Sequence, residues 1–229
     1  MHLIDLLHWF QQNFIHLDKS LEHIVSVYGV WVYAILFAIV FCETGLVVTP
    51  FLPGDALLFA IGAYAVSHPG SGLAWPLAMV LLIGAAILGN LLNFSIGGLL
   101  GGRIFREKAL VLKREYLDRA HAFFEKHGPK AVILARFLPI FRTLVPFVAG
   151  MASMERPRFV LHTVIGSVLW VFLMMISGVL FGRIPWVQSH FETVVLGIIV
   201  VSMIPVAFEA VTQFLGSRKA GGESAGREG

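Results

Sequence analysis

Apolar residues occur along the chain in long runs separated by short polar segments, and some of these runs are continuous. Residues 76–100 and 159–181 are each long enough to cross the roughly 30 Å of hydrocarbon in a bilayer. A turn at residues 183–186 precedes a further apolar run at 187–214. We therefore predict transmembrane spans in these three ranges.

Two other apolar runs, residues 28–66 and 131–154, are interrupted by charge, proline and glycine. The interruptions in the first run are Glu43, Gly45, Pro50, Pro53, Gly54 and Asp55, and those in the second are Arg136, Pro139, Arg142, Pro146 and Gly150. Proline removes a backbone donor and clashes with the preceding turn, so neither run suits an unbroken helix. We predict re-entrant helical hairpins, which need protein or water to satisfy their broken backbone. Two complete spans in residues 28–66 are the alternative.

Three further segments are more polar. Residues 1–27 place apolar side chains on one helical face, which predicts either an interfacial helix or a helix packed on the bundle. Residues 103–130 hold eight basic and four acidic side chains, so the positive-inside rule places this loop in the cytoplasm. Within it, apolar residues at helical spacing predict a surface amphipathic helix. Residues 215–229 are polar and glycine-rich, typical of a disordered tail, also predicted to be cytoplasmic.

The order of elements repeats: amphipathic segment, interrupted hairpin, span, and the same again, followed by one extra span. Both hairpins also contain a P-F-x-x-G spacing, Pro50 to Gly54 and Pro146 to Gly150. If the first span ends in the cytoplasm, the hairpins enter from opposite sides, as in many secondary transporters. We predict an all-α integral membrane protein: an inverted-repeat bundle, residues 28–214, with two re-entrant hairpins.

Composition supports the membrane class and excludes several functions. Hydrophobic residues make up 57% and charged residues 14% of the 229, against about 25% charged in soluble domains. The single cysteine excludes an internal disulfide, and a net charge of +3 gives no reason to expect nucleic acid. No zinc-protease, phosphate-loop, dinucleotide-binding or serine-hydrolase motif is present in the sequence, so we expect no catalytic residues, cofactor or metal.

Four charged residues lie inside the interrupted runs, the acids Glu43 and Asp55 and the bases Arg136 and Arg142. Each ionised side chain at a bilayer centre costs roughly 2.5–3.5 kcal/mol, so these groups should pair, face water or neutralise. The acids can bind a cation or exchange protons, although Asp55 also suits a helix N-cap. The arginines can hold phosphate, or they can form ion pairs that link the hairpins.

Two amides, Asn90 and Asn93, lie within the predicted span 76–100. Because lipid-facing amides are costly, both should point into the bundle or a polar cavity. We expect contacts between helices there more than contact with a ligand.

The two interrupted runs resemble the signature motifs of the DedA family, whose members share the VTT domain. In this chain, the residues that resemble the first motif are Glu43-x-Gly45 with Pro50-x-x-Pro53-Gly54-Asp55. Those that resemble the second motif are Arg136-Phe137-x-Pro139-x-x-Arg142-Thr143-x-x-Pro146-x-x-Ala149-Gly150. The resemblance extends over residues 28–214. Many relatives have Gly-Asp with a later tyrosine where this chain has Gly89-Asn90 and Phe94. That difference puts in doubt any coupling role of the missing aspartate.

The resemblance implies a function in moving lipids between bilayer leaflets. Family members are associated with the return of undecaprenyl phosphate to the cytoplasmic face and with dependence on the proton-motive force. By motif position, Glu43 and Asp55 correspond to the essential acids of the family, and Arg136 and Arg142 to its essential bases. A lipid flippase of the bacterial inner membrane, without covalent catalysis, is the leading hypothesis. A proton-coupled cation transporter and a non-transporting scaffold are alternatives, and a homo-oligomer is left open.

Overall fold

In the part of the chain that the computed structural model describes, every regular element is a helix, which confirms the predicted all-α class. The structure describes residues 27–46, 54–104, 114–138, 141–191, 193–198 and 200–201. The α-helices are α3 (Trp31–Gly45), α4 (Gly54–Ser67), α5 (Trp75–Ile104), α6 (Arg114–His127), α7 (Ala131–Leu134), α8 (Phe141–Met151), α9 (Arg156–Phe181) and α10 (Pro185–Ser189). Two short 3-10 segments, η1 (Gly128–Lys130) and η2 (Ala135–Phe137), flank α7.

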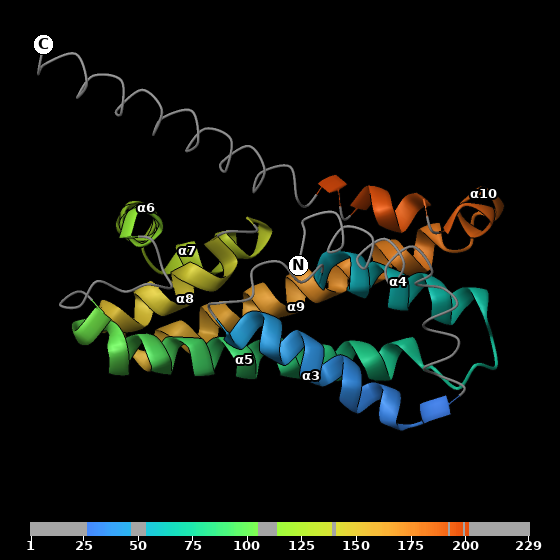
Figure 1. Cartoon of the computed structure of the whole chain (residues 1–229), viewed down its shortest axis with the longest axis horizontal. Helices are drawn as coiled ribbons and strands as arrows, with labels where there is room; N and C mark the ends of the chain where they lie inside the picture. Colours follow the sequence, from blue (N-terminus) through green and yellow to red (C-terminus); the bar gives the residue numbers. More distant parts are fainter. Residues whose placement is uncertain are drawn as a thin grey trace, which may run out of the picture.

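Two long apolar helices, α5 and α9, pack against each other and run in opposite directions along the molecule (Figure 1). Their apolar stretches are Trp75–Leu99, with 25 residues, and Arg156–Phe181, with 26 residues. At 1.5 Å per residue each stretch is about 38 Å long, which exceeds the roughly 30 Å of bilayer hydrocarbon. Length and composition therefore make both helices suitable as membrane spans.

The shorter apolar helices form two bent pairs, α3 with α4 and α7 with α8. Helices α3, α4 and α8 contain 15, 14 and 11 residues. At 1.5 Å per residue they are roughly 16–23 Å long, too short to cross a bilayer alone. The chain becomes extended at Leu46 after α3 (φ −99°, ψ 119°) and at Leu138 after η2 (φ −117°, ψ 109°). Each predicted hairpin is thus broken where charge and proline interrupt the apolar run.

Each bent pair is shared between the two long helices. Helix α3 packs on α5 while α4 packs on α9, and likewise α7 packs on α9 while α8 packs on α5. The returning arm of each pair therefore contacts the long helix of the other half. This exchange interlocks the two halves of the chain.

Glycines bring the crossing of α4 and α9 to backbone contact. A side chain added at Gly62 would collide with the Met175 carbonyl, and one added at Gly178 would collide with the Phe59 carbonyl. In both helices the glycine follows the contacted residue by three positions. Small residues of this kind allow close helix approach in membranes, where packing rather than hydrophobicity drives association.

The crossing of α8 and α5 has the same reciprocal pattern. A side chain at Gly150 would collide with the Phe94 carbonyl, and one at Gly97 would collide with the Phe147 carbonyl. Each glycine again follows the contacted residue by three positions. The two crossings are therefore equivalent, with α4 matching α8 and α9 matching α5.

This equivalence differs from the correspondence that the P-F-x-x-G spacing predicts. The crossings align Gly150 with Gly62, whereas the sequence spacing aligns Gly150 with Gly54. Gly54 is the first residue of α4, but Gly150 lies one residue before the end of α8. The two P-F-x-x-G sequences therefore do not occupy equivalent positions in the two halves of the structure.

Two apolar clusters fill the bundle, and buried polar side chains separate them along both long helices. On α5 the first cluster ends at Ala86 and the second includes Phe94, with the buried Asn90 and Asn93 between them. On α9 the second cluster includes Phe159 and the first resumes at Trp170. The buried Thr163 and Ser167 lie between these two residues. A polar layer therefore crosses the centre of the bundle.

Helix α6 lies within the predicted loop 103–130 and packs on α8. Its Ala120 is fully buried, and the ring of Phe123 stacks on that of Phe141 with centroids 5.0 Å apart. The predicted interfacial segment 1–27 falls almost wholly outside the described residues, as does the predicted tail 215–229. Of the predicted span 187–214, the structure describes α10 and short helical stretches up to residue 201.

The glycine crossings predict a position-dependent effect of adding one methyl group. Gly150→Ala should lower the free energy of unfolding by about 1–3 kcal/mol, because its methyl group must push α8 away from the α5 backbone. Thermal unfolding of the purified protein in detergent measures the change. Gly84→Ala, on α5 with no atom within 4 Å of an added side chain, is the matched control and should not destabilise. Equal effects of both substitutions would contradict close packing at Gly150.

Candidate functional site

The four charged residues of the interrupted runs lie at the ends of helices where the two bent pairs break. Glu43 is in the last turn of α3 and Asp55 is the second residue of α4. Arg136 is the middle residue of η2, and Arg142 is the second residue of α8. Both pairs therefore place one charge where the chain enters the break and one where it leaves. The acids belong to one break and the bases to the other.

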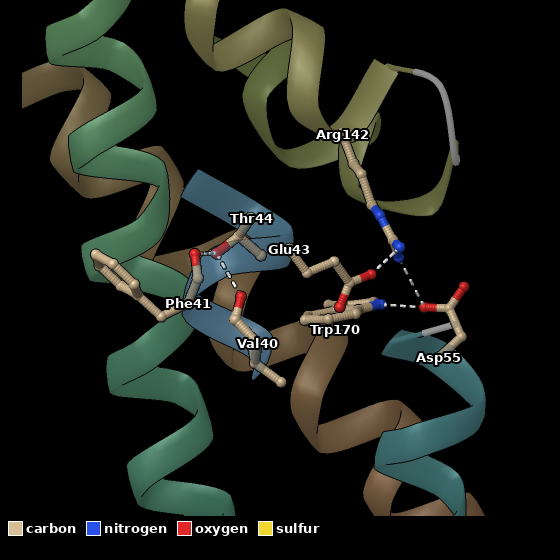
Figure 2. A network of polar contacts seen from close by, with 7 residues as sticks. All are labelled: Val40, Phe41, Glu43, Thr44, Asp55, Arg142 and Trp170. Atoms are coloured by element: carbon tan, nitrogen blue, oxygen red, sulfur yellow. Dashed lines mark hydrogen bonds and ion pairs between the residues drawn. The ribbon is translucent and has the colours of Figure 1, made fainter. Parts of the chain in front are cut away.

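Arg142 contacts both acids. Its Nη2 donates to Oε1 of Glu43, which is fully buried, and its Nη1 donates to Oδ1 of Asp55 at 3.3 Å (Figure 2). Arg142 itself is only 9% exposed and Asp55 is 21% exposed. A planar guanidinium group suits this arrangement because it can direct separate N–H donors at two carboxylates. One arginine thus links α8 to both arms of the first bent pair.

Glycine at position 54 makes room for the Glu43 carboxylate. A side chain added at Gly54 would collide with both carboxylate oxygens of Glu43. The start of α4 therefore lies directly against the end of α3, so the two acids lie close enough to share Arg142. This contact gives Gly54 of the predicted motif a steric role.

Arg136 has a different environment from Arg142. Its Nη2 donates to the Ala86 carbonyl at 3.2 Å and to Oγ of Ser167 at 2.6 Å. Its side chain is 5% exposed, and its Nε has no hydrogen-bond partner among the described residues. In that part of the chain no carboxylate forms an ion pair with it. Arg136 is thus a buried cation whose direct hydrogen-bond partners are neutral.

Trp170, a residue that the sequence did not single out, contacts three of the four charged side chains: those of Asp55, Arg136 and Arg142. Its Nε1 donates to Oδ1 of Asp55 at 2.7 Å (Figure 2). The guanidinium carbons of Arg136 and Arg142 lie 5.5 and 5.6 Å from the centroid of its ring. A tryptophan in the middle of an apolar span is unusual, since tryptophan favours membrane interfaces, and this is the signal that could have identified it.

Asn93 connects the two breaks through backbone carbonyls. Its Nδ2 donates to the carbonyl of Thr44, at the end of α3, at 3.3 Å. The same amide nitrogen donates to the carbonyl of Thr143, at the start of α8, at 2.8 Å. The Thr44 carbonyl lies in the last turn of α3 and lacks a helical donor, which Asn93 supplies, while the Thr143 carbonyl near the start of α8 is an additional acceptor. The contacts agree with the interhelical role expected for this residue.

Asn90 and its neighbours occupy the position where this chain departs from the family motif. Asn90 is buried, and its Nδ2 has no hydrogen-bond partner within the described ranges. The preceding Gly89 has no room for a side chain, because one would collide with Oγ1 of Thr44. Phe94 stacks on Phe159, with ring centroids 4.2 Å apart. In this chain the position of the usual tyrosine therefore belongs to an apolar contact.

The remaining motif residues lie in α8, at the end of α3, or outside the described residues. Thr143, Pro146 and Gly150 lie in α8 and are buried, and Pro146 leaves the carbonyl of Arg142 without the helical N–H donor that any other residue would supply. Gly45 ends α3, and a side chain there would approach the Gly89 backbone at 3.3 Å. Pro50, Pro53 and Pro139 lie outside the described residues.

The site combines two buried cations, two acids and several amide and hydroxyl groups. Such an arrangement can bind a small anion at the arginines or exchange a proton at the acids. Among the described residues no group of three or more histidine, cysteine, aspartate or glutamate side chains is placed to hold a metal ion. The arginines and acids present suit recognition of charge and movement of protons.

The fold and site define an integral membrane protein in which two bent helix pairs bring opposite charges together inside an apolar bundle. Residues 27–180 match the VTT domain, and the chain belongs to the DedA family, which has this domain. This finding confirms the family that the two motifs indicate.

The chain is 49% identical over 209 residues to Protein DedA of Escherichia coli, covering 91% of this chain and 95% of that protein. It is 34% identical over 154 residues to Inner membrane protein YqjA of Escherichia coli, with 67% and 69% covered. Identity to Uncharacterized membrane protein Rv0364 of Mycobacterium tuberculosis is 33% over 219 residues, with 95% and 90% covered. No solved structure matches the chain.

The contacts of Arg142 predict that its removal destabilises the protein and that removal of its partner offsets part of the loss. Arg142→Met should lower the free energy of unfolding by about 3–5 kcal/mol, because it leaves a buried carboxylate uncompensated. The double variant Arg142→Met with Glu43→Gln should recover part of the loss. Thermal unfolding in detergent measures both variants, and an unchanged melting temperature for Arg142→Met would contradict the assignment.

Proposed function

We propose that this protein is a lipid flippase that moves a phosphate-bearing lipid between the leaflets of a bacterial inner membrane. Undecaprenyl phosphate or a related phospholipid is the proposed substrate. One observation favours this function above the others: of two buried arginines, Arg142 is bound by both acids, while Arg136 is hydrogen-bonded to neutral acceptors. Arg136 therefore keeps its charge available for the head group, and guanidinium groups bind phosphate well.

The proposed path follows the polar layer of the bundle. The two bent pairs are proposed to be re-entrant hairpins that enter the membrane from opposite sides, with residues 103–130 and the C-terminus in the cytoplasm. The antiparallel α5 and α9 and the short arms of each pair support this arrangement. The head group would pass between the two breaks, at the arginines, while the acyl or prenyl tail remains in lipid.

Charge balance suggests how protons would be coupled to this movement. With the acids ionised, the four groups have no net charge, so an added phosphate is uncompensated. Protonation of Glu43 or Asp55 leaves one excess positive charge, which favours phosphate binding in a medium of low dielectric constant. Loss of the proton restores the ion pairs with Arg142 and favours release. Binding of the anionic lipid would thus be accompanied by proton uptake.

The two alternatives have less support from the contacts. A bound cation would have to compete with the buried guanidinium group of Arg142, which contacts Oε1 of Glu43 and Oδ1 of Asp55. A scaffold would explain the ion pairs of Arg142 but gives no reason for the environment of Arg136. Ion flux without added lipid would identify a cation carrier. Full tolerance of substitutions at all four charges, with expression retained, would identify a scaffold.

The role of Arg136 can be tested with the purified full-length protein in vesicles that contain a labelled prenyl phosphate. Arg136→Gln should slow translocation by at least about tenfold, since a hydrogen bond to a charged group contributes roughly 1.5–3 kcal/mol. Glutamine keeps a polar amide at this buried position but is two atoms shorter than arginine, so thermal unfolding in detergent must show that the variant is folded.

Arg158→Gln is the matched control for this experiment, because Arg158 is an arginine on α9 that is 66% exposed and paired with Glu155. Its translocation rate should equal that of the unmodified protein. The flippase function would be abandoned if vesicles with the unmodified protein moved the lipid no faster than protein-free vesicles under every pH gradient.

Proton coupling predicts a second result in the same vesicles. Translocation by the unmodified protein should change with the direction of an imposed pH gradient, while Glu43→Gln, which cannot titrate at that position, should respond less. Glu155→Gln removes a carboxylate that is 65% exposed and serves as the control. A response of Glu43→Gln equal to that of the unmodified protein would exclude Glu43 as the coupling group.

A further inference from the structure

We infer that Trp170 is a positioning residue that holds Asp55 and both arginines in the arrangement that receives the lipid phosphate. This inference rests on the proposed function. Trp170 lies in the middle of α9, is 1% exposed and is the largest of the fully buried side chains among the described residues. It belongs to neither signature motif.

The indole group offers two kinds of contact at once. Its face attracts cations and its N–H edge donates to acceptors. Both features are used here, since the guanidinium carbons of Arg136 and Arg142 lie within 5.6 Å of the ring centroid and Nε1 donates to Asp55. One rigid side chain from α9 therefore contacts residues of α4, η2 and α8.

The contact with Asp55 determines where the indole lies. Oδ1 of Asp55 accepts from Nε1 of Trp170 at 2.7 Å and from Nη1 of Arg142 at 3.3 Å, so both donors converge on one oxygen atom (Figure 2). A buried indole N–H without an acceptor is unfavourable, which fixes the ring orientation as long as Asp55 is in place. The oriented ring in turn positions both guanidinium groups, whose central carbons lie over it.

This arrangement explains how two like charges can remain close together inside the bundle. Arg142 has its acids, but Arg136 has only neutral hydrogen-bond partners in the described structure, and the ring face supplies a favourable contact to both. A phosphate bound at Arg136 would then lie near Arg142, whose guanidinium group faces the same ring. Without the indole N–H, Asp55 would lose the hydrogen bond that holds its carboxylate in position to accept from Arg142.

Two variants separate the N–H contact from the ring face. Trp170→Phe keeps an aromatic face and removes the donor, while Trp170→Leu removes both. We expect labelled prenyl phosphate to move roughly tenfold more slowly with Trp170→Phe, the scale of a lost hydrogen bond to a charged group. Trp170→Leu should be slower still. Phe159→Leu, a fully buried aromatic residue on the same helix but among apolar partners, controls for loss of core volume.

A double-mutant cycle in detergent distinguishes positioning from simple packing. Trp170→Phe should lower the melting temperature of the unmodified protein, but it should have little effect in the Asp55→Ala background, where the acceptor is already absent. A residue that only fills space would lower the melting temperature equally in both backgrounds.

The inference holds only if Trp170→Phe slows translocation and the cycle is non-additive; any other result with an active unmodified protein overturns it. A failure of the unmodified protein to move the lipid overturns the proposed function instead. The two failures are therefore distinguishable.

Discussion

The buried guanidinium group of Arg142 is paired with two acids, and this cluster of charges constrains the arrangement of the bundle. Glu43 and Asp55 reach it from two different helices, α3 and α4, so both helices must end or begin next to α8. Several features allow these three charged groups to lie together. The chain breaks between the helices of each pair, Gly54 leaves room for the Glu43 carboxylate, and Asn93 donates to carbonyls of both α3 and α8. The bent pairs are short because they need to extend only as far as the polar layer.

The sequence predicted the breaks well because their cause is local. Prolines or glycines next to charged residues occur at both breaks, although Pro146 and Gly150, which the sequence pattern counted among the interruptions, lie within α8. The different environments of Arg136 and Arg142 could not be predicted, because helical periodicity is lost at the break between them. Trp170 was missed for another reason: it lies 115 residues from Asp55, and no local pattern connects the two. The carbonyl that each glycine meets at the crossings could not be predicted either, since it belongs to a helix distant in the sequence.

The two halves of the chain are alike in geometry and opposite in charge. Reciprocal glycines at the crossings of α4 with α9 and of α8 with α5 give both halves the same close packing. Near the starts of α4 and α8, the second residues are Asp55 and Arg142, which differ by one position in the alignment that the crossings give. The two halves keep the same backbone contacts but contribute opposite charges to the site. The two arginines of the second half therefore balance the two acids of the first half.

The exchange of arms between the halves has a consequence for how the protein is made. Helix α4 packs on α9, and Asp55 finds its indole partner only 115 residues later in the chain. At about 5–20 residues per second, the ribosome needs roughly 6–23 s to synthesise that stretch. During this interval the nascent first half contains two acids whose compensating arginines have not yet been made or have not yet reached them. Biogenesis therefore requires a waiting state, in which the acids stay protonated, hydrated or shielded by the insertion machinery until the second half arrives.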